Sequence, residues 1–361
     1  MQKLNFETVF AHQIVFVENL NHSKIKGYRY GSVTAVAHSN IALIKYWGKR
    51  AIQKNLPAVG SISLTLDALH TKTTLQFDEA LKQDVFLLNE EKVEGKQLKR
   101  ISDFLNLAVG YSERPKARII SKNNFPTGAG LASSASGFAA LALVLDDRLG
   151  LNLNRENLSA LARMGSGSAA RSLYGGFVEM KLGSKDDGSE DVAVQLKDES
   201  HWDLRLLAAV TSTQKKDLGS TEGMNRTAET APFYDVWISS QPKDIEEMKK
   251  AISAKDFEKL GELTEHSCFK MHGLAMAARP PILYWNAATT ETIHRVWKLR
   301  QSGIPAFVTI DAGPQVKILC LSDSVDEIKE AVLDVNGVEY IIEAKPGPAA
   351  RIVHPEKEII R

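Results

Sequence analysis

A run of small residues that leads directly into an apolar stretch constrains the fold of this chain more than any other feature. The run is "NNFPTGAGLASSASG" (Asn123 to Gly137), and the stretch that follows it is "FAALALVLDDRLG". A helix that is apolar on nearly every side is buried. Every helix start has unpaired backbone N–H groups and the positive end of the helix dipole. Here serine hydroxyls are added to them in the first turn.

Two interpretations of this turn remain open on the residues alone. Unpaired N–H groups at a helix start bind phosphate, and small side chains let the backbone approach it closely. The alternative is a tight strand-to-helix turn that packs against a sheet. The turn has neither the GxxxxGK spacing of a Walker A loop nor the GxGxxG spacing of a dinucleotide-binding turn.

A second turn of small residues, "GSGSAAR" (Gly165 to Arg171), favours the anion-binding interpretation. It ends in an arginine, whose planar guanidinium suits a carboxylate or a phosphate. A helix C-cap followed by a surface arginine is the alternative for this turn. Neither turn has the GxSxG elbow and evident base of a serine hydrolase, so that class of enzyme is disfavoured.

The overall charge of the chain gives no indication of a polyanionic partner. Lys+Arg 45 and Asp+Glu 44 leave a formal net charge of +1, so we expect no nucleic acid or membrane partner. Cys268 and Cys320 are too few for a disulfide framework and are expected to be reduced core thiols. The N-terminus lacks the apolar region of a signal peptide, and no apolar run reaches the roughly 20 residues that span a bilayer. We therefore expect a soluble, cytoplasmic protein.

The order of strand-like and helix-like segments predicts an α+β protein with mostly antiparallel sheets and two domains. Residues 32–48 are predicted as a strand and loop, and residues 61–67 and 71–77 as two strands of an antiparallel hairpin or meander. Helix-rich sequence follows residue 212, and the end of the chain is typical of strand, helix and strand. We place the domains at 1–195, with 1–31 as an N-terminal extension, and at 196–361.

Three segments, "AHSNIALIKYWGKR", "FPTGAGLASSASG" and "GSGSAARSLYGGFV", resemble the GHMP small-molecule kinase superfamily and, within it, the diphosphomevalonate decarboxylases. The resemblance continues in "STEGM", "MHGLAMAARPPILYW", "TIDAGPQVKIL" and "KPGPAA", and it spans residues 32–350. It implies the GHMP kinase fold: an N-terminal domain like domain 2 of ribosomal protein S5, a ferredoxin-like C-terminal domain, and an active site in the cleft between them. It also implies a homodimer.

The resemblance implies an ATP- and Mg²⁺-dependent reaction of the mevalonate pathway. The tertiary 3-hydroxyl of 5-diphosphomevalonate is phosphorylated, and phosphate and carbon dioxide then leave to give isopentenyl diphosphate. Phosphorylation makes the hydroxyl a good leaving group, and the carboxylate supplies the electrons as positive charge develops at C3. Phosphoryl transfer itself needs positioning and charge neutralisation more than covalent chemistry.

Residue roles carried over from the family form three groups. For catalysis, Asp311 is a general base or orienting carboxylate, Lys45 tunes it, and Arg171 holds the substrate carboxylate. The implied substrate contacts are Tyr46, Lys49, Ser61, Ser166, Ser168 and Arg171. The implied ATP contacts are Pro126, Gly128, Ala129, Gly130, Leu131, Ala132, Ser133, Ser134 and Ser220, with Mg²⁺ held through the ATP phosphates and Ser134.

Structural alternatives exist for several of these residues. On the residues alone, Asp311 is an Asx-turn cap at the end of a strand, and the lysines of "IKYWGK" are solvated loop residues. Ser63 shares a strand face with Ser61 and is either a substrate contact or part of a half-exposed strand. His272 is expected to be a packed structural histidine rather than a catalytic one.

The chain departs from the family pattern at four positions. Ala51 stands where the family usually has an acidic residue, Val59 and Gln315 stand where it has asparagine, and Thr221 is arginine in some members. Lys72, Lys99, Arg100 and Lys216 are basic candidates for compensation. The departures leave two alternatives within the superfamily, a 5-phosphomevalonate decarboxylase and a mevalonate 3-kinase. A non-catalytic ligand-binding protein of the same fold is a third.

Replacing the aspartate of "TIDAGP" tests the catalytic assignment. We expect Asp311→Asn to preserve folding and ATP binding but to lose most turnover, because the amide cannot act as a base. Turnover is measured as ADP release, and ATP binding by calorimetry. A near-normal kcat in this variant would refute the assignment.

Overall fold

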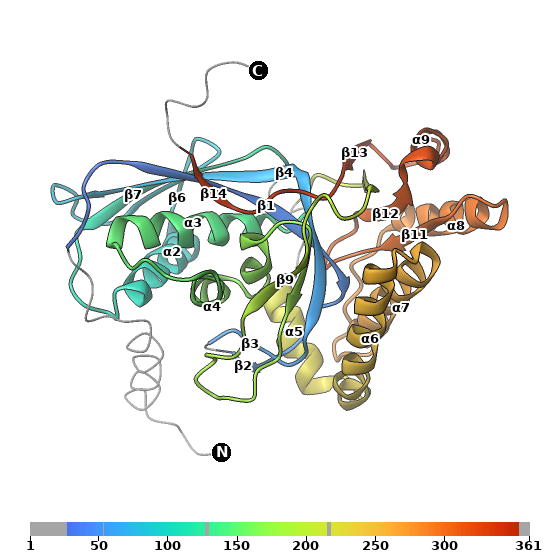
Figure 1. Ribbon diagram of the computed structural model, residues 1–361, viewed down its shortest axis with the longest axis horizontal. Coiled ribbons are helices and arrows are strands. Elements are labelled where there is room, and N and C mark those ends of the chain that lie inside the picture. Colours follow the sequence, from blue (N-terminus) through green and yellow to red (C-terminus); the bar gives the residue numbers. More distant parts are fainter. Residues whose placement is uncertain (1–26, 53, 127–129, 215–217, 354–361) are drawn as a thin grey trace.

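The computed structural model describes residues 27–52, 54–126, 130–214 and 218–353, which form two sheet-and-helix layers side by side (Figure 1). Most of the predicted N-terminal extension lies outside the described residues, as do Gly128, Ala129 and Lys216. The α+β architecture and the predominance of antiparallel pairing agree with the prediction from sequence.

The first layer is a large sheet in the order β14-β1-β4-β7-β5-β6, with β8 paired to β4 and β9 to β8. Its pairings are antiparallel except between β5 and β7. The strands are β1 (Val33–Ile44), β4 (Ser61–Asp78), β5 (Val85–Leu88), β6 (Glu91–Val93), β7 (Lys116–Asn123), β8 (Phe177–Met180), β9 (Ala193–Lys197) and β14 (Arg351–Val353). A small hairpin, β2 (Lys49–Ala51) with β3 (Leu56–Pro57), follows β1.

One prediction about this sheet is wrong. The segments 61–67 and 71–77 are not two strands of a hairpin but parts of the single 18-residue strand β4. The link between them, "DALH", contains no glycine or proline that would favour a turn. Each half of β4 also has its own second partner, β8 at Ser61–Leu64 and β7 at Thr71–Asp78, while β1 pairs with both halves.

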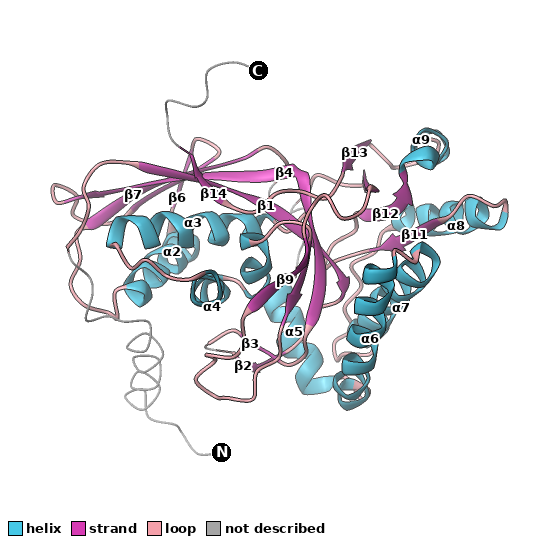
Figure 2. Ribbon diagram, viewed as in Figure 1, coloured by secondary structure: helices cyan, strands magenta, loops and turns pink. Residues whose placement is uncertain are grey.

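Helices cover one side of the large sheet, where α2, α3 and α4 gather (Figure 2). They are α2 (Gly95–Ala108), α3 (Ser133–Leu149), α4 (Arg155–Gly165) and the 3-10 helix η2 (Gly167–Leu173). Helix α3 is the buried helix that the sequence predicts, and it packs on β1 and β4. Fully buried alanines such as Ala139 and Ala142 let its backbone lie close to the sheet.

The second layer is a four-stranded sheet in the order β11-β12-β10-β13, covered by helices (Figure 1). Its strands are β10 (Leu204–Val210), β11 (Ala306–Thr309), β12 (Val316–Leu321) and β13 (Tyr340–Ala344). Its helices are α5 (Ser220–Thr230), α6 (Tyr234–Ala254), α7 (Phe257–Met276), α8 (Ala287–Gln301), η3 (Ser322–Ser324) and α9 (Val325–Leu333).

A shared apolar core joins the two layers. Ile41 and Leu64 of the large sheet pack in one cluster with Met248 of α6, Leu260 of α7 and Leu319 of β12. The last strand, β14, returns from the second layer to pair with β1. The predicted division at residue 195 stays a prediction, because the two halves of the chain share both a core and a sheet.

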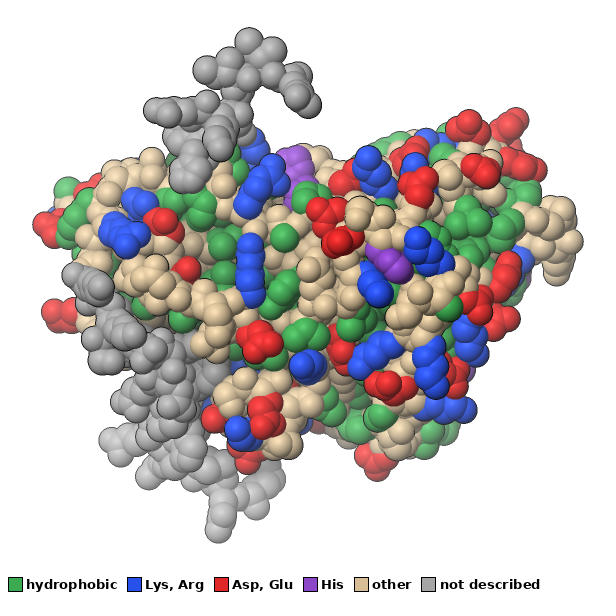
Figure 3. Space-filling model, in the orientation of Figure 1, with side chains coloured by type: hydrophobic (Ala, Val, Ile, Leu, Met, Phe, Trp, Pro, Cys, Tyr) green, Lys and Arg blue, Asp and Glu red, His purple; other side chains and the backbone are tan. Residues whose placement is uncertain are grey.

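The surface and the thiols agree with the composition. Figure 3 shows acidic and basic side chains interspersed on the face in view, without an extended area of one sign. Cys268 and Cys320 are free and buried, as predicted. None of the helices in the described part of the chain has the length and apolar character needed to cross a bilayer.

A buried ion pair ties α2 to the large sheet. The two Nη atoms of Arg114 donate to the two carboxylate oxygens of Asp84 at 2.8 and 2.6 Å, and both side chains are at most 5% exposed. Arg114 Nε also donates to Asn106 at the end of α2, and the backbone N–H of Ala117 at the start of β7 donates to Asp84. Burial alone would raise the pKa of Asp84, but these hydrogen bonds lower it below its ordinary value.

We expect Arg114→Met to reduce the free energy of unfolding by roughly 3–5 kcal/mol, because it leaves Asp84 buried without its cation. Lys99→Met is the control, since Lys99 and Asp103 form an exposed pair that contributes at most about 1 kcal/mol. Urea unfolding measures both. The stabilisation from Asp84 is present above its ordinary pKa of 3.8 and is lost as pH falls through the lower pKa of the folded state. Equal losses in the two variants would contradict this account.

Candidate active site

A cavity of about 430 Å³ lies where the two layers meet. Its walls come from β1, the β2–β3 hairpin, α2, the starts of α3 and α5, η2, α7 and the turn after β11. The lining residues are Asn40, Ala42, Lys45, Tyr46, Trp47, Lys49, Asn55, Arg100, Gly130, Ala132, Ser133, Ser134, Ser166, Gly167, Ser168, Arg171, Gly219, Ser220, Thr221, Met224, Met271, Asp311 and Ala312.

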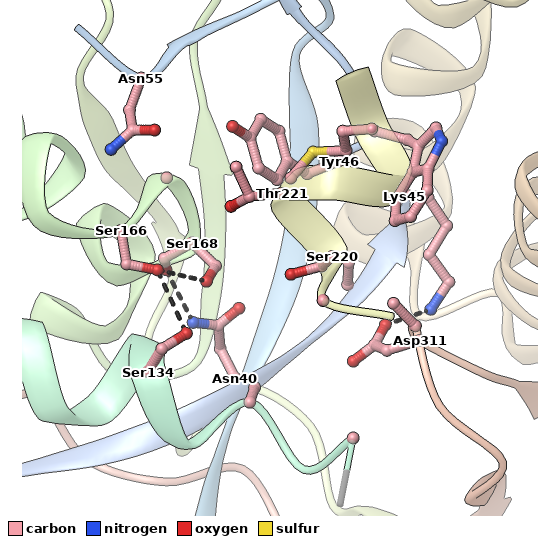
Figure 4. A pocket seen from close by; sticks show the side chains of 18 of the residues that line it. Asn40, Lys45, Tyr46, Asn55, Ser134, Ser166, Ser168, Ser220, Thr221 and Asp311 are labelled. Atoms are coloured by element: carbon pink, nitrogen blue, oxygen red, sulfur yellow. Dashed lines mark hydrogen bonds and ion pairs between the residues drawn. The ribbon is translucent and has the colours of Figure 1, made fainter. Parts of the chain in front are cut away.

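A lysine and an aspartate from the two layers form an ion pair in this cavity (Figure 4). Lys45 directly follows β1, and its Nζ lies 2.8 Å from Oδ1 of Asp311 in the turn after β11. The backbone of Lys45 is held by the second layer, because its N–H donates to Ser267 of α7 and its carbonyl accepts from Gln241 of α6. The lysine side chain is 1% exposed and the aspartate 25%. The pair is therefore fixed on one side and open to the cavity on the other.

The surroundings of Asp311 favour its ionised form. Burial alone would raise the pKa of Asp311, but the positive charges of Lys45, Lys317 and Arg171 outweigh burial and hold the pKa below its ordinary value of 3.8. A carboxylate in this state can accept a hydrogen bond or a proton from a hydroxyl group placed beside it.

Arg171 lines the cavity, and its buried guanidinium is held by two hydrogen bonds. Nη1 donates to Ser61 Oγ at 2.7 Å and Nη2 to Asn40 Oδ1 at 3.2 Å, and the residue is 2% exposed. Burial lowers its pKa to about 10, so it remains charged at neutral pH. Ser61 supports Arg171 here and is not among the lining residues, so its predicted role as a direct substrate contact stays a prediction.

Hydroxyl groups line the wall on the side of α3 and η2. Ser134, Ser166 and Ser168 point toward one another (Figure 4), with Oγ–Oγ distances of 3.3 Å for the first two and 3.5 Å for the last two. Asn40 donates to the backbone carbonyl of Ser168 at 3.1 Å and to Ser172 Oγ at 2.8 Å. The predicted serines of both small-residue turns thus meet at one place, and Asn40 joins them to Arg171.

Two basic side chains line another part of the cavity. Lys49 Nζ donates to Asn55 Oδ1 at 2.6 Å, and Arg100 of α2 donates to the backbone carbonyl of Gly165 at 2.7 Å. Burial, and then the charge of Arg100, lower the pKa of Lys49 to about 8. Sequence reasoning named Arg100 only among four basic candidates and missed Asn55 and Asn40. Asn40 could have been noticed as a polar residue within the apolar strand "NIALI".

The starts of two helices face the cavity. Gly130 has φ +83°, and a Cβ there would lie 3.2 Å from Cα of Gly313, so the turn before α3 packs closely on the turn after β11. Ser133 and Ser134 line the cavity from α3, and Ser220 lines it from the first residue of α5.

Other predicted site residues lie elsewhere. Leu131 is 3% exposed and belongs to the apolar core that joins the layers, and neither Leu131 nor Pro126 is among the residues that line this cavity. Their assignment as ATP contacts stays a prediction. Ser63 is fully buried. His272 is buried, with Nε2 3.1 Å from the carbonyl of Ile310, and burial lowers its pKa to about 3. This agrees with the packed histidine that we expected.

A second cavity, of about 230 Å³, adjoins the first turn of α3. It shares Arg100, Ser133 and Ser134 with the first cavity, so the two are neighbours. Its other lining residues are Thr71, Phe86, Leu88, Gln97, Ile101, Ile119, Ser121, Asn123, Gly137, Phe138 and Leu141. The walls are thus mainly apolar, with a few side chains that can form hydrogen bonds.

The oxygen ligands at the site fit a magnesium ion that is coordinated mainly by the phosphates of a nucleotide. Among the described residues, no three His, Cys, Asp or Glu side chains gather into a possible metal cage. The cavity instead presents the hydroxyls of Ser133, Ser134 and Ser220 and the carboxylate of Asp311. Such oxygen donors suit Mg²⁺, which usually keeps several waters and binds through one or two protein groups plus substrate phosphates.

Fold and site together define the class of protein. Two α+β layers, with a hydroxyl-rich helix start and a Lys–Asp pair in the cleft between them, are the GHMP kinase fold that the sequence predicts. Two family models match the chain: the diphosphomevalonate decarboxylase-like N-terminal domain over residues 37–193, and the mevalonate 5-diphosphate decarboxylase C-terminal domain over residues 206–353. This chain belongs to the diphosphomevalonate decarboxylase family.

Known relatives agree with this membership. The diphosphomevalonate decarboxylase of Candida albicans is 40% identical over 303 residues, which cover 80% of this chain and 83% of the relative. A solved structure of "MDDEF in complex with MVAPP, AMPPCP and Magnesium" matches with TM-score 0.84 and 41% identity, covering 90% of this chain and 99% of that one. The mevalonate diphosphate decarboxylase of Staphylococcus aureus matches with TM-score 0.84 and 39% identity, covering 90% and 98%.

Proposed function

We propose that this protein is an ATP-dependent decarboxylase that converts (R)-5-diphosphomevalonate and ATP into isopentenyl diphosphate, ADP, phosphate and carbon dioxide, with Mg²⁺ held by the ATP phosphates. The observation that carries the proposal is the Lys45–Asp311 pair, which opens into a cavity lined by basic and hydroxyl side chains. Membership of the diphosphomevalonate decarboxylase family supports it.

Asp311 and Arg171 take the two roles that the reaction requires. The ionised Asp311 accepts the proton of the substrate 3-hydroxyl, or orients that hydroxyl, as its oxygen attacks the terminal phosphate of ATP. Lys45 keeps the carboxylate ionised and aligned through the 2.8 Å contact. Arg171 orients the substrate carboxylate, with Ser166 and Ser168 beside it. Ser61 and Asn40 hold the guanidinium of Arg171 in place. Arg171 can therefore orient the substrate carboxylate and keep its own position when carbon dioxide leaves.

The nucleotide occupies the starts of α3 and α5. N–H groups at helix N-termini bind phosphate without adding net charge, and Ser133, Ser134 and Ser220 add hydroxyl donors. The second cavity is suited to the purine ring, because apolar side chains such as Phe86 and Ile119 line it together with polar groups such as Asn123. Mg²⁺ held by the phosphates and by Ser134 would neutralise the charge that develops during phosphoryl transfer.

Lys49, Arg100 and Asn55 hold the phosphate end of the substrate, together with Tyr46. Two basic side chains suit a diphosphate better than the uncharged end of free mevalonate. A relative of this chain was solved in complex with MVAPP, which supports the diphosphate. A 5-phosphomevalonate decarboxylase and a mevalonate 3-kinase remain the alternatives that use the same residues. A cytoplasmic location and a homodimer remain predictions as well.

A product assay with three substrates tests the proposal. ATP and Mg²⁺ are supplied with mevalonate, 5-phosphomevalonate or 5-diphosphomevalonate, and ADP and carbon dioxide are measured together. We expect equal amounts of both products from the diphosphate, and at least about tenfold lower kcat/KM with the monophosphate, because one charged contact contributes more than about 1.4 kcal/mol. ADP without carbon dioxide would indicate a 3-kinase, and no product from any substrate would indicate a binding protein.

The pKa of Lys49 predicts a pH dependence of substrate binding. Lys49 loses its charge as pH rises through about 8, so the KM for the phosphorylated substrate rises above that pH, by at most about tenfold per pH unit for one proton. Lys49→Arg keeps a positive charge throughout this range and removes the rise. The KM for ATP serves as the internal control. An equal rise in wild type and Lys49→Arg would show that another group titrates.

A further inference from the structure

Strand β12 contains a buried lysine on the face that meets the first layer. Val316, Ile318 and Cys320 alternate along the strand into the core beneath α8 and α9. Lys317 points to the opposite face with Leu319, which packs in the core shared by the two layers. Lys317 is only 2% exposed. Burying a lysine is costly unless its charge and its donors are used, so its contacts indicate what it does.

The first contact of Lys317 is with the turn before α3. Its Nζ donates to the backbone carbonyl of Gly130 at 2.8 Å, which links a strand of the second layer to a loop of the first. Gly130 also packs against Gly313, two residues after Asp311. The turn that opens α3, the catalytic turn and the lysine are therefore one contiguous unit.

The second partner of Lys317 is Asp311. Both line a small cavity behind the active site, together with Asn40 and Ala132. The groups that act electrostatically on Asp311 are Lys45 of the segment after β1, Lys317 of β12 and Arg171 of η2. His272 and Cys268 of α7 also lie near Asp311, but burial keeps both uncharged at neutral pH, with pKa values of about 3 and about 11. Lys317 is thus one of three charged groups that oppose the burial of this carboxylate.

We propose that Lys317 is a positioning residue that fixes the turn at Gly130 for the ATP phosphates and holds it in register with Asp311. The inference rests on the proposed function, since it assigns ATP to the start of α3. Lys317 touches neither substrate nor ATP. It acts through the carbonyl of Gly130, which it keeps turned away from the phosphates, and through its charge on Asp311.

The test compares Lys317→Met, which removes donor and charge, with Lys317→Arg, which keeps both. ADP affinity is measured by calorimetry without a second substrate, and kcat for carbon dioxide release is measured against pH. We expect Lys317→Met to weaken ADP binding about tenfold, the effect of losing one charge-assisted hydrogen bond. The acid limb of its kcat profile moves to higher pH, because Asp311 loses one of its cations. Lys317→Arg stays within about threefold of wild type in both measurements.

Lys270→Met is the matched control, because Lys270 is also a largely buried lysine, paired with Asp244 at 2.6 Å, but it lies outside the cavity. We expect it to lower the melting temperature and leave ADP affinity and the pH profile unchanged. If Lys317→Met lowers only the melting temperature, Lys317 is a structural residue and the proposal is wrong. The same holds if Lys317→Arg fails to restore ADP affinity.

One further outcome separates this inference from the proposed function. If wild type releases no carbon dioxide from 5-diphosphomevalonate, the proposed function fails, while a loss of ADP affinity in Lys317→Met still supports the role at Gly130.

If Lys317→Met does not yield folded protein, Lys317→Gln takes its place, because the glutamine amide can still donate a hydrogen bond to the Gly130 carbonyl. Unchanged ADP affinity together with an unchanged acid limb in that variant would likewise overturn the proposal.

Discussion

The ion pair between Lys45 and Asp311 is the interaction on which the rest of the site depends. It joins the end of β1 in the first layer to the turn after β11 in the second, and the lysine is almost fully buried. Deleting the side chain of either partner would leave a buried charge without its counterion, which is strongly destabilising, whereas asparagine at position 311 keeps an acceptor oxygen for Lys45. The pair forms only when both layers are in register, and Ser267 and Gln241 hold the lysine backbone for that purpose. The contact that joins the layers is thus also the pair to which we assign the chemistry.

Charge in the cleft is distributed very differently from charge in the whole chain. The net charge is +1, yet among the described residues that line the main cavity Lys45, Lys49, Arg100 and Arg171 face a single acidic residue, Asp311. Partial burial strengthens the attraction of these cations for phosphate and carboxylate groups. Helix starts and serine hydroxyls supply the remaining donors without adding charge. A near-neutral protein can therefore receive two highly anionic molecules in one place.

The two glycine-containing turns show how backbone geometry serves this arrangement. Gly130 adopts a positive φ, and a Cβ at this position would lie only 3.2 Å from Cα of Gly313. Their contact brings the start of α3 next to Asp311. Lys317 of β12 stabilises this contact by donating a hydrogen bond to the Gly130 carbonyl. Small residues in the sequence thus mark the places where segments far apart in the chain approach most closely.

Much of the local structure could be predicted from sequence, because it depends on short-range patterns. The nearly continuous apolar character of α3 and the small residues before it predicted a buried helix with a polar start, and Ser166 and Ser168 of the second turn line the cavity. The single strand β4 was missed, because its continuity depends on pairing with β7 and β8, which are distant in the chain. Ser61 and Leu131 were placed in the site by position in a motif, whereas in the structure Ser61 accepts a hydrogen bond from Arg171 and Leu131 packs in the shared core.

The sequence by itself determined the family and most of the local elements, with β4 as an exception, because both depend on residue types at short spacings. Only the tertiary structure decided which of the basic residues lie together at the wall of the cavity. Arg100 lies on α2 and Lys49 in the hairpin after β1, and only the packing of α2 against the large sheet brings them to one wall. The same holds for Lys317, an ordinary strand residue in the sequence. Its role follows from the contact between the two layers, a long-range property that no local pattern records.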